Sequence, residues 1–161
     1  MLILFRKYLP QMVYGAVDGT VTTFAVVAGA TGGDLSNRTI IILWLASLLA
    51  DGASMSISAY LSARSDTSTS SMFSKKTPFS MALWTLASFV VIGFIPMIPF
   101  VFNLWGFTAS SVMTGAAFVL IGGLRAKIGK TPIIVSIIQT LALGTIAALI
   151  AYGVGMWLAG I

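Results

Sequence analysis

The residues of this sequence that could do chemistry are few, and the acidic ones are four aspartates. The chain contains no glutamate, histidine or cysteine. Their absence excludes disulfides, zinc–thiolate sites, Ser-His-Asp triads and imidazole ligands. A metal ion would therefore have to bind carboxylate, thioether, hydroxyl or carbonyl groups.

Asp18 and Asp51 both lie inside long apolar stretches. An ionisable residue there costs at least about 2.5–3.5 kcal/mol, and such residues usually face a cavity, a partner or an ion path. Two structural explanations stay open: an ion pair, or a neutral aspartate bonded to a hydroxyl. The ion pair is disfavoured because no basic residue lies in the middle of an apolar stretch. Asp34 falls in a polar turn, where a solvated structural role is expected.

Met55 follows Asp51 by four residues, so both project from one face of a helix. A carboxylate beside a thioether suits a divalent transition metal of intermediate softness better than Mg²⁺ or Ca²⁺. Methionine is also a common packing residue in apolar helices. The accessory groups that could add oxygen atoms are Tyr14 and Thr22, at four residues on either side of Asp18, Tyr60 after Met55, and Asp66.

The composition indicates what must position these groups. Of the 161 residues, 58% are hydrophobic and 8% are charged, and the mean hydropathy is +1.01. A soluble domain carries roughly 25% charged residues, whereas a bilayer accommodates this much apolar surface. We therefore expect an all-α, polytopic membrane protein that forms one transmembrane domain over residues 1–161. The five predicted transmembrane helices span about 12–30, 39–62, 78–100, 108–124 and 132–158.

The breaks between these stretches are polar or rich in turn residues. Ser36 or Asn37 is the expected N-cap of the second helix. Pro96 and Pro99 predict a kinked or irregular end of the third helix. A basic loop is expected over 125–132.

The basic residues predict the orientation. With the N-terminus inside, eight of them fall on inner segments and only Arg38 on an outer loop, which follows the positive-inside rule. The eight are Arg6, Lys7, Arg64, Lys75, Lys76, Arg125, Lys127 and Lys130. We expect a cytoplasmic N-terminus, a C-terminus on the far side and no nucleic-acid partner. The host membrane would be the cytoplasmic (cell) membrane in a prokaryote or a vacuole-like membrane in a eukaryote.

The first stretch has an alternative interpretation as a signal peptide. Arg6 and Lys7 resemble its charged region, and Ala-Gly-Ala at 28–30 resembles a cleavage site. Asp18 argues against this interpretation, because a carboxylate is badly placed in the apolar region of a signal peptide.

Two segments resemble the signatures of the vacuolar iron transporter family. Residues 15–29, GAVDGTVTTFAVVAG, resemble the first-helix signature of that family. Residues 50–55, ADGASM, followed by YLS at 60–62, resemble its second-helix signature. The motifs occur in the expected order with a short loop between them. The resemblance covers the whole chain in the number of spans and is strong over residues 14–66.

The resemblance implies a five-helix protomer that forms a homodimer, with the translocation path between the protomers. Members of the family move Fe²⁺, and often Mn²⁺ or similar ions, out of the cytosol in exchange for protons. By motif match, Asp18 and Met55 line the path, and Asp51 matches an acid of the second-helix signature. The metal is then the transported substrate and no cofactor is expected. Gly15 and Gly19 allow close helix approach, which would place the first helix near the dimer axis.

The sequence departs from the family pattern at two places. Ala59 stands where the family usually has an acid just before the Tyr-Leu-Ser run. Many members also carry a Glu-rich cytoplasmic metal-binding domain between the second and third helices, whereas this region is short here and has Asp66 as its sole acid. Plant nodulin-like relatives also lack that domain, so its absence does not remove transport.

The leading interpretation is export of a divalent transition metal from the cytosol by proton antiport, and hence not an enzyme. Measured from the predicted inner helix ends, Asp18 lies roughly 9 Å in and Asp51 roughly 16 Å in, as successive steps of one path. A non-transporting membrane partner or degenerate paralogue stays open, with Ala59 as its main support. An intramembrane aspartyl protease would use the two aspartates as an acid–base dyad, but the sequence lacks a Gly-x-Gly-Asp motif.

Overall fold

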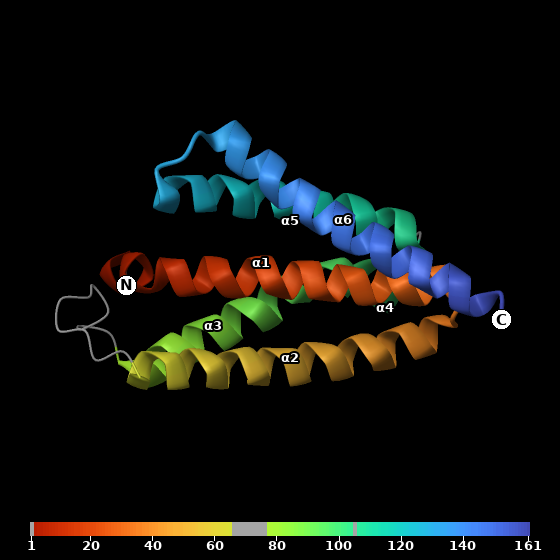
Figure 1. The fold of residues 1–161 in the computed structure, drawn as a ribbon, viewed down its shortest axis with the longest axis horizontal. Helices are drawn as coiled ribbons and strands as arrows, with labels where there is room; N and C mark the ends of the chain where they lie inside the picture. The colour runs from red at the N-terminus through yellow and green to blue at the C-terminus, as the bar shows by residue number, and fades with distance from the viewer. Residues whose placement is uncertain (1, 66–76, 105) are drawn as a thin grey trace.

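The computed structural model describes residues 2–65, 77–104 and 106–161, which form a bundle of long helices (Figure 1). In chain order the elements are α1 (Leu2–Gly32), α2 (Asn37–Ser65), α3 (Pro78–Gly93), the 3₁₀ turn η1 (Ile95–Met97), α4 (Ile98–Val101), α5 (Gly106–Gly129) and α6 (Ile133–Ala159). The predicted all-α class is thus confirmed.

Within the described part of the chain, five helical segments are long and apolar enough to cross a membrane. They are Lys7–Gly32, Asn37–Ser65, Pro78–Val101, Gly106–Gly129 and Ile133–Ala159. The predicted number of spans is confirmed, but several are longer than the sequence suggested. For example, α5 continues to Gly129 and includes the first part of the basic loop that was expected over 125–132.

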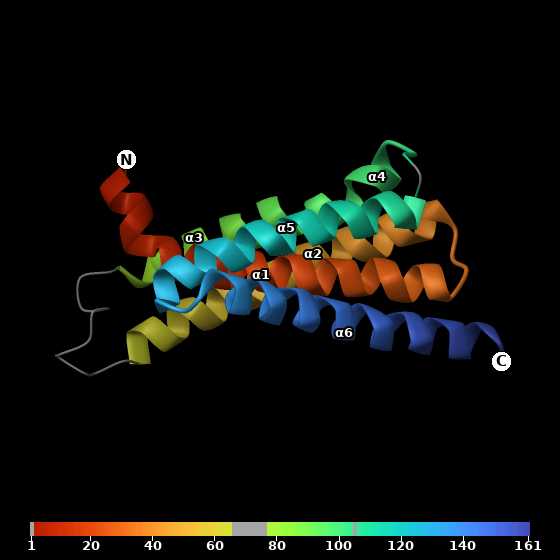
Figure 2. The same ribbon diagram turned by 90° about the horizontal axis from the view of Figure 1, so that it is seen from above.

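The helix α1 begins at Leu2 rather than at residue 12, and it contains Pro10. Figure 2 shows the first turns of α1 directed away from the rest of the helix. Proline removes one helical hydrogen bond and its ring crowds the preceding turn, so a bend at this place has an identifiable cause. The helix thus begins ten residues before the predicted start of the first span, and its membrane-crossing segment begins at Lys7.

A tight turn joins α1 to α2. Asp34 adopts a positive φ of 53°, a conformation that aspartate tolerates better than most residues. The amide of Leu35 then donates to the carbonyl of Ala30 at 3.0 Å, which closes the end of α1. Ser36 Oγ accepts a hydrogen bond from the amide of Thr39 at 3.3 Å, so Ser36 is the N-cap of α2. It is one of the two residues that the sequence predicted for this position.

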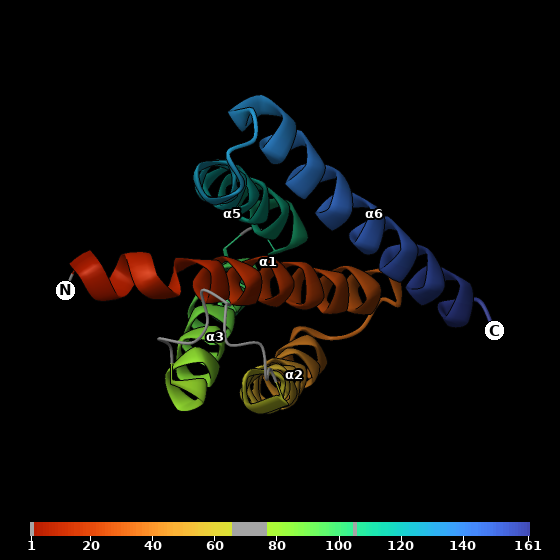
Figure 3. The same ribbon diagram turned by 60° about the vertical axis from the view of Figure 1, so that its left-hand side comes forward.

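The helix α1 is the centre of the bundle. In Figures 1 and 3, α2 and α3 lie on one side of it and α5 and α6 on the other. Its most extensive contacts are with α3 and α6. The remaining face of α1, between α2 and α6, is left partly uncovered and carries the candidate site.

Glycines let α1 approach two neighbours at backbone distance. A Cβ atom at Gly19 would lie 2.5 Å from the carbonyl oxygen of Phe89 in α3, and one at Gly15 would also overlap α3. On the side of α6, a Cβ at Gly155 would overlap the carbonyl oxygen of Gly29. These close-approach positions therefore serve contacts within the protomer, and they lend no support to the expected dimer contact.

The third membrane-crossing segment is broken, as Pro96 and Pro99 predicted. Its course changes from α3 through η1 to α4, and two carbonyls near the break accept hydrogen bonds from other helices. Trp44 Nε1 donates to the carbonyl of Gly93 at 3.4 Å, and Ser110 Oγ donates to that of Pro96 at 2.5 Å. Because an unsatisfied carbonyl is costly in hydrocarbon, these bonds hold the irregular segment in place.

Four buried threonine hydroxyl groups inside the helices are satisfied locally. Each of four fully buried threonines donates to the carbonyl four residues earlier, at 2.6–2.9 Å. They are Thr20, Thr85, Thr114 and Thr140. This pattern removes the cost of burying a donor in an apolar medium, so these residues are structural and need no ligand.

Candidate functional site

Asp18 lies on the uncovered face of α1 and is exposed in the single chain. It lines a hollow of about 410 Å³ together with Tyr14 and with Arg125 of α5. Its backbone carbonyl accepts a hydrogen bond from Thr22 Oγ1 at 2.6 Å. The carboxylate is thus displayed on a rigid helix, near the middle of a membrane-crossing segment, without protein covering it.

Asp51 is half-buried at the midpoint of α2. Its Oδ2 accepts a hydrogen bond from Ser47 Oγ at 2.6 Å. Ser47 is one helical turn before Asp51 on the same face. The hydroxyl fixes one carboxylate oxygen and leaves the other able to bind a cation.

The two carboxylates lie at the same depth in the bundle. Asp18 precedes the end of α1 at Gly32 by fourteen residues, and Asp51 follows the start of α2 at Asn37 by fourteen residues. At 1.5 Å per residue, each is about 21 Å from the turn that joins the helices. The helices α1 and α2 also contact each other, so the two aspartates lie on adjacent helices. The sequence predicted two successive depths from the inner ends, and counting from the joining turn instead puts the two residues level, because both helices extend beyond their predicted ends.

Met55 is half-buried and packs against the main hydrophobic cluster of the bundle, which includes Leu48 and Phe89. It lies one turn after Asp51 on α2, so the two side chains share a face as predicted. Part of this side chain therefore has a packing role. Its spacing from Asp51 also leaves a thioether available on the same wall as the carboxylate.

The four accessory residues do not form one group. Tyr14 is 63% exposed beside Asp18, and the Thr22 hydroxyl is engaged with a backbone carbonyl. Tyr60 lies near the C-terminal end of α2, where the Arg64 guanidinium lies over its ring at 5.8 Å. Asp66 falls outside the described residues, so its role stays a prediction.

Sequence reasoning missed two residues at this site, Ser47 and Arg125. The first was detectable, because a hydroxyl four residues from an aspartate on a helix is in hydrogen-bonding range. The second was assigned to a loop, and its position in the same hollow as Asp18 depends on how α5 packs against α1.

The described residues of a single chain gather few side chains that could bind a metal ion. Within the described residues, no three side chains of the acidic, histidine or cysteine type come together. The neighbouring pair of carboxylates, with one thioether nearby, is therefore the metal-binding chemistry that the described part of one chain offers.

The fold and the site define a class: an all-helical membrane protein with one aspartate near the middle of each of its first two spans. Comparison with known families identifies the family. The sequence model of the VIT family matches residues 9–72 and 67–156 of this chain, and the chain belongs to that family. The resemblance found in the two helix signatures is thereby confirmed. The two matches meet between α2 and α3, where the sequence has its short Ser/Thr-rich connection.

Three curated proteins with the name "Vacuolar iron transporter" are similar to part of the chain. The one from Toxoplasma gondii is 44% identical over 59 residues, which is 37% of this chain and 20% of that protein. Those from Plasmodium berghei and Plasmodium falciparum are 33% and 34% identical over 57 residues, 35% of this chain and 21% of each protein. The matched region thus spans about a fifth of the length of these relatives.

Proposed function

We propose that this protein transports a divalent transition metal ion, Fe²⁺ and also Mn²⁺, across a membrane. The observation that carries the proposal is the placement of the Asp18 and Asp51 carboxylates, which lie level with each other near the middle of two adjacent spans. Membership of the VIT family and the names of the similar proteins support iron as a cargo. Those names also support a vacuole-type membrane as the location in a eukaryotic host.

Two neighbouring carboxylates in a medium of low dielectric repel each other strongly when both are charged. A divalent cation bound between Asp18 and Asp51 removes this repulsion, and so does a proton on one of them. Metal and proton are therefore alternative occupants of the same pair. Exchange between them is the chemical basis for proton antiport, and the proposed direction for the metal is out of the cytosol.

The uncovered position of Asp18 favours a homodimer. A carboxylate that faced lipid near the bilayer centre would cost at least about 2.5–3.5 kcal/mol. A second protomer packed on the face of α1 between α2 and α6 would enclose it. Two protomers would then offer four carboxylates and two Met55 thioethers around one axis, which makes up for the incomplete set in a single chain.

The orientation of this assembly follows from the positive-inside rule. We place the N-terminus and the inner ends of α2 and α5 on the cytoplasmic side, where Arg64 and Lys127 lie. The hollow that contains Asp18 also contains Arg125, near this end of α5. Metal would reach the carboxylates from that end and leave toward the turn that joins α1 to α2.

Metal uptake by proteoliposomes tests the proposal. Purified wild-type protein should carry Fe²⁺ into vesicles with an acidic interior, and uptake should collapse when a protonophore removes the gradient. Asp18→Asn and Asp51→Asn retain side-chain size and remove the charge, so each should lower uptake to that of protein-free vesicles. Asp34→Asn is the matched control, because asparagine also tolerates the positive φ of this turn.

Wild-type uptake by both Asp18→Asn and Asp51→Asn proteins would refute the transport role of the pair. The aspartates would then be structural hydrogen-bonding groups. Uptake that needs the aspartates but persists without a pH gradient would refute only proton antiport. Circular dichroism and gel filtration of each variant separate a transport defect from a folding defect.

A further inference from the structure

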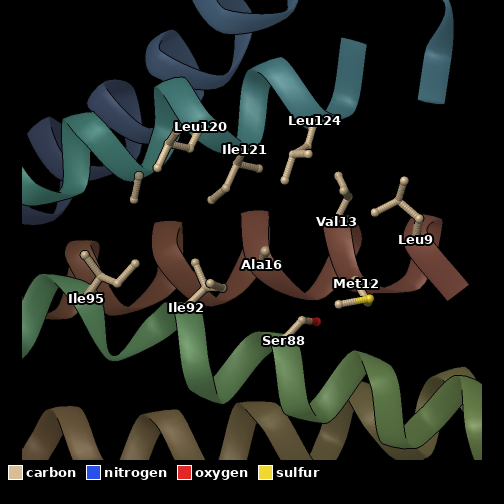
Figure 4. Close-up of a pocket in the computed structure, with 11 residues that line it drawn as sticks. Leu9, Met12, Val13, Ala16, Ser88, Ile92, Ile95, Leu120, Ile121 and Leu124 are labelled. Carbon is tan, nitrogen blue, oxygen red and sulfur yellow. The ribbon is translucent and has the colours of Figure 1, made fainter. Parts of the chain in front are cut away.

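An apolar groove lies between α1, α3 and α5, apart from the aspartate pair (Figure 4). Its volume is about 270 Å³. Val13, Ala16 and Ile121 form part of its floor and are less than a tenth exposed. At its rim, Leu120 is 70% exposed and Leu124 is 41% exposed. The groove therefore opens sideways on the surface that faces lipid in a membrane.

The groove results from how the helices pack. Gly15 and Gly19 bring α1 into backbone contact with α3, while α5 packs on α1 through the cluster of Val13, Ala16 and Ile121. Both helices contact α1, but among the described residues α3 and α5 make few contacts with each other. The space between them, above α1, is left open over about two turns of α1, roughly 10 Å.

Water is a poor occupant of this groove. Ser88 is the only lining residue with a hydroxyl group, and that hydroxyl donates to the carbonyl of Thr85 at 3.0 Å. A buried water needs two to four polar partners. An empty groove would in turn forfeit the dispersion contacts of its walls. A neighbouring helix, about 10–12 Å across with its side chains, is too wide to enter.

Cations stand at one end of the groove. Lys7 precedes the lining residue Leu9 by two positions, and Lys127 follows the lining residue Leu124 by three. Lys127 also lines an adjoining hollow together with Leu120 and Leu124. The Lys7 ammonium lies 5.3 Å from the centre of the Tyr8 ring, at the same end of α1 as the lining residue Leu9. An apolar groove that adjoins the Lys127 ammonium, with a second lysine at the same end of the bundle, matches an acyl chain attached to an anionic headgroup.

We propose that the groove holds one acyl chain of an anionic phospholipid, whose phosphate lies near Lys7 and Lys127. The inference does not depend on metal transport. Each lysine near the membrane surface is expected to contribute about fivefold to the preference for an anionic over a neutral headgroup. The site would thus select lipid by charge, while its walls accept any chain of suitable width.

Photolabelling in lipid nanodiscs tests the proposal. A phosphatidylglycerol that carries a diazirine in the middle of one acyl chain is incorporated at low density, and labelled residues are mapped by mass spectrometry. Labels should concentrate on the groove residues of α1, α3 and α5 and be sparse at Val112, a lipid-facing residue of α5 that is 69% exposed. Labelling spread evenly around the bundle would overturn the proposal.

Two variants block the groove in different ways. Ala117→Phe fills the floor, and Leu120→Trp covers the mouth at an exposed position where folding is little affected. Each should reduce groove labelling to the level at Val112, whereas Val112→Phe should leave it unchanged. Undiminished labelling in Leu120→Trp protein, shown to be folded by gel filtration, would contradict the assignment.

The headgroup is tested by competition. Unlabelled phosphatidylglycerol should displace the probe about fivefold more effectively per lysine than phosphatidylcholine, and the double variant Lys7→Gln/Lys127→Gln should compete equally with both lipids. Equal competition in the wild-type protein would refute the anionic headgroup. A preference that the double variant retains would refute the part assigned to the lysines.

Discussion

Replacement of Gly155 by alanine should destabilise the bundle, whereas the same replacement at Gly153, two residues earlier on α6, should not. A Cβ atom at Gly155 would overlap the carbonyl oxygen of Gly29 and lie 2.8 Å from the amide nitrogen of Gly33. A Cβ at Gly153 would meet nothing within 4 Å. The two positions therefore share a helix and a chemical change but differ in their surroundings.

The magnitude follows from the contact between α1 and α6. An ordinary contact needs at least 3.4 Å, so the amide of Gly33 alone requires the helices to separate by several tenths of an ångström. Overpacking of this kind costs about 1–3 kcal/mol. Alanine at an unobstructed glycine stabilises by about 0.4–1 kcal/mol, because the unfolded chain loses freedom. We expect the Gly155→Ala protein to be less stable than the Gly153→Ala protein by roughly 1–3 kcal/mol.

Thermal unfolding in one detergent, followed by tryptophan fluorescence, measures this difference. For a chain of this size each kcal/mol corresponds to about 2–4 °C in Tm. Gly153→Ala should match or exceed the wild-type Tm, and Gly155→Ala should fall below it. Equal Tm values for the two variants would show that α6 does not touch α1 at backbone distance, and the central position of α1 would be wrong.

Three further predictions concern the site and the orientation. Met55→Leu retains the side-chain volume and removes the sulfur. Vesicle uptake of Fe²⁺ should therefore fall more than that of Mn²⁺, since the softer ion depends more on a thioether. Equal losses for the two ions would count against sulfur ligation. Ser47→Ala removes the hydrogen bond to one oxygen of Asp51 and should raise the KM for metal by up to roughly tenfold. Ser47→Thr keeps the hydroxyl and should restore the wild-type KM. An unchanged KM in Ser47→Ala would show that the hydroxyl does not position the carboxylate. The chain has no cysteine, so Ser65→Cys and Ile161→Cys can be labelled singly, and they should react from opposite sides of a sealed membrane. Reaction of both from one side would exclude the five-span orientation.

The number of membrane spans was predictable because it depends on length and hydropathy, which the sequence states directly. The residues at which the helices begin and end were harder to predict. The first span was predicted to begin at about residue 12, yet α1 begins at Leu2 and continues through Pro10 with a bend. Arg125 and Lys127 looked like a loop, although basic residues also suit the last turns of a helix.

The candidate site was predictable in part for a similar reason. Asp51 and Met55 share a face by spacing alone, and the tight turn between two antiparallel helices made Asp18 a neighbour of α2. Their common depth needed the true helix ends. The presence of Arg125 in the same hollow as Asp18 is a consequence of tertiary packing, for which no local pattern exists.

The packing of α1 links the stability of the bundle to its proposed chemistry. One face of α1 touches α3 through Gly15 and Gly19, and another touches α6 through Gly29. Backbone contacts on two sides fix the depth and the rotation of the helix more firmly than flexible side chains would. Asp18 lies between Gly15 and Gly19 in sequence but faces outward, so its carboxylate is displayed from the least movable part of the bundle. A site in which metal and proton exchange on one carboxylate pair needs that pair at a fixed separation, and the glycines on either side of Asp18 provide it.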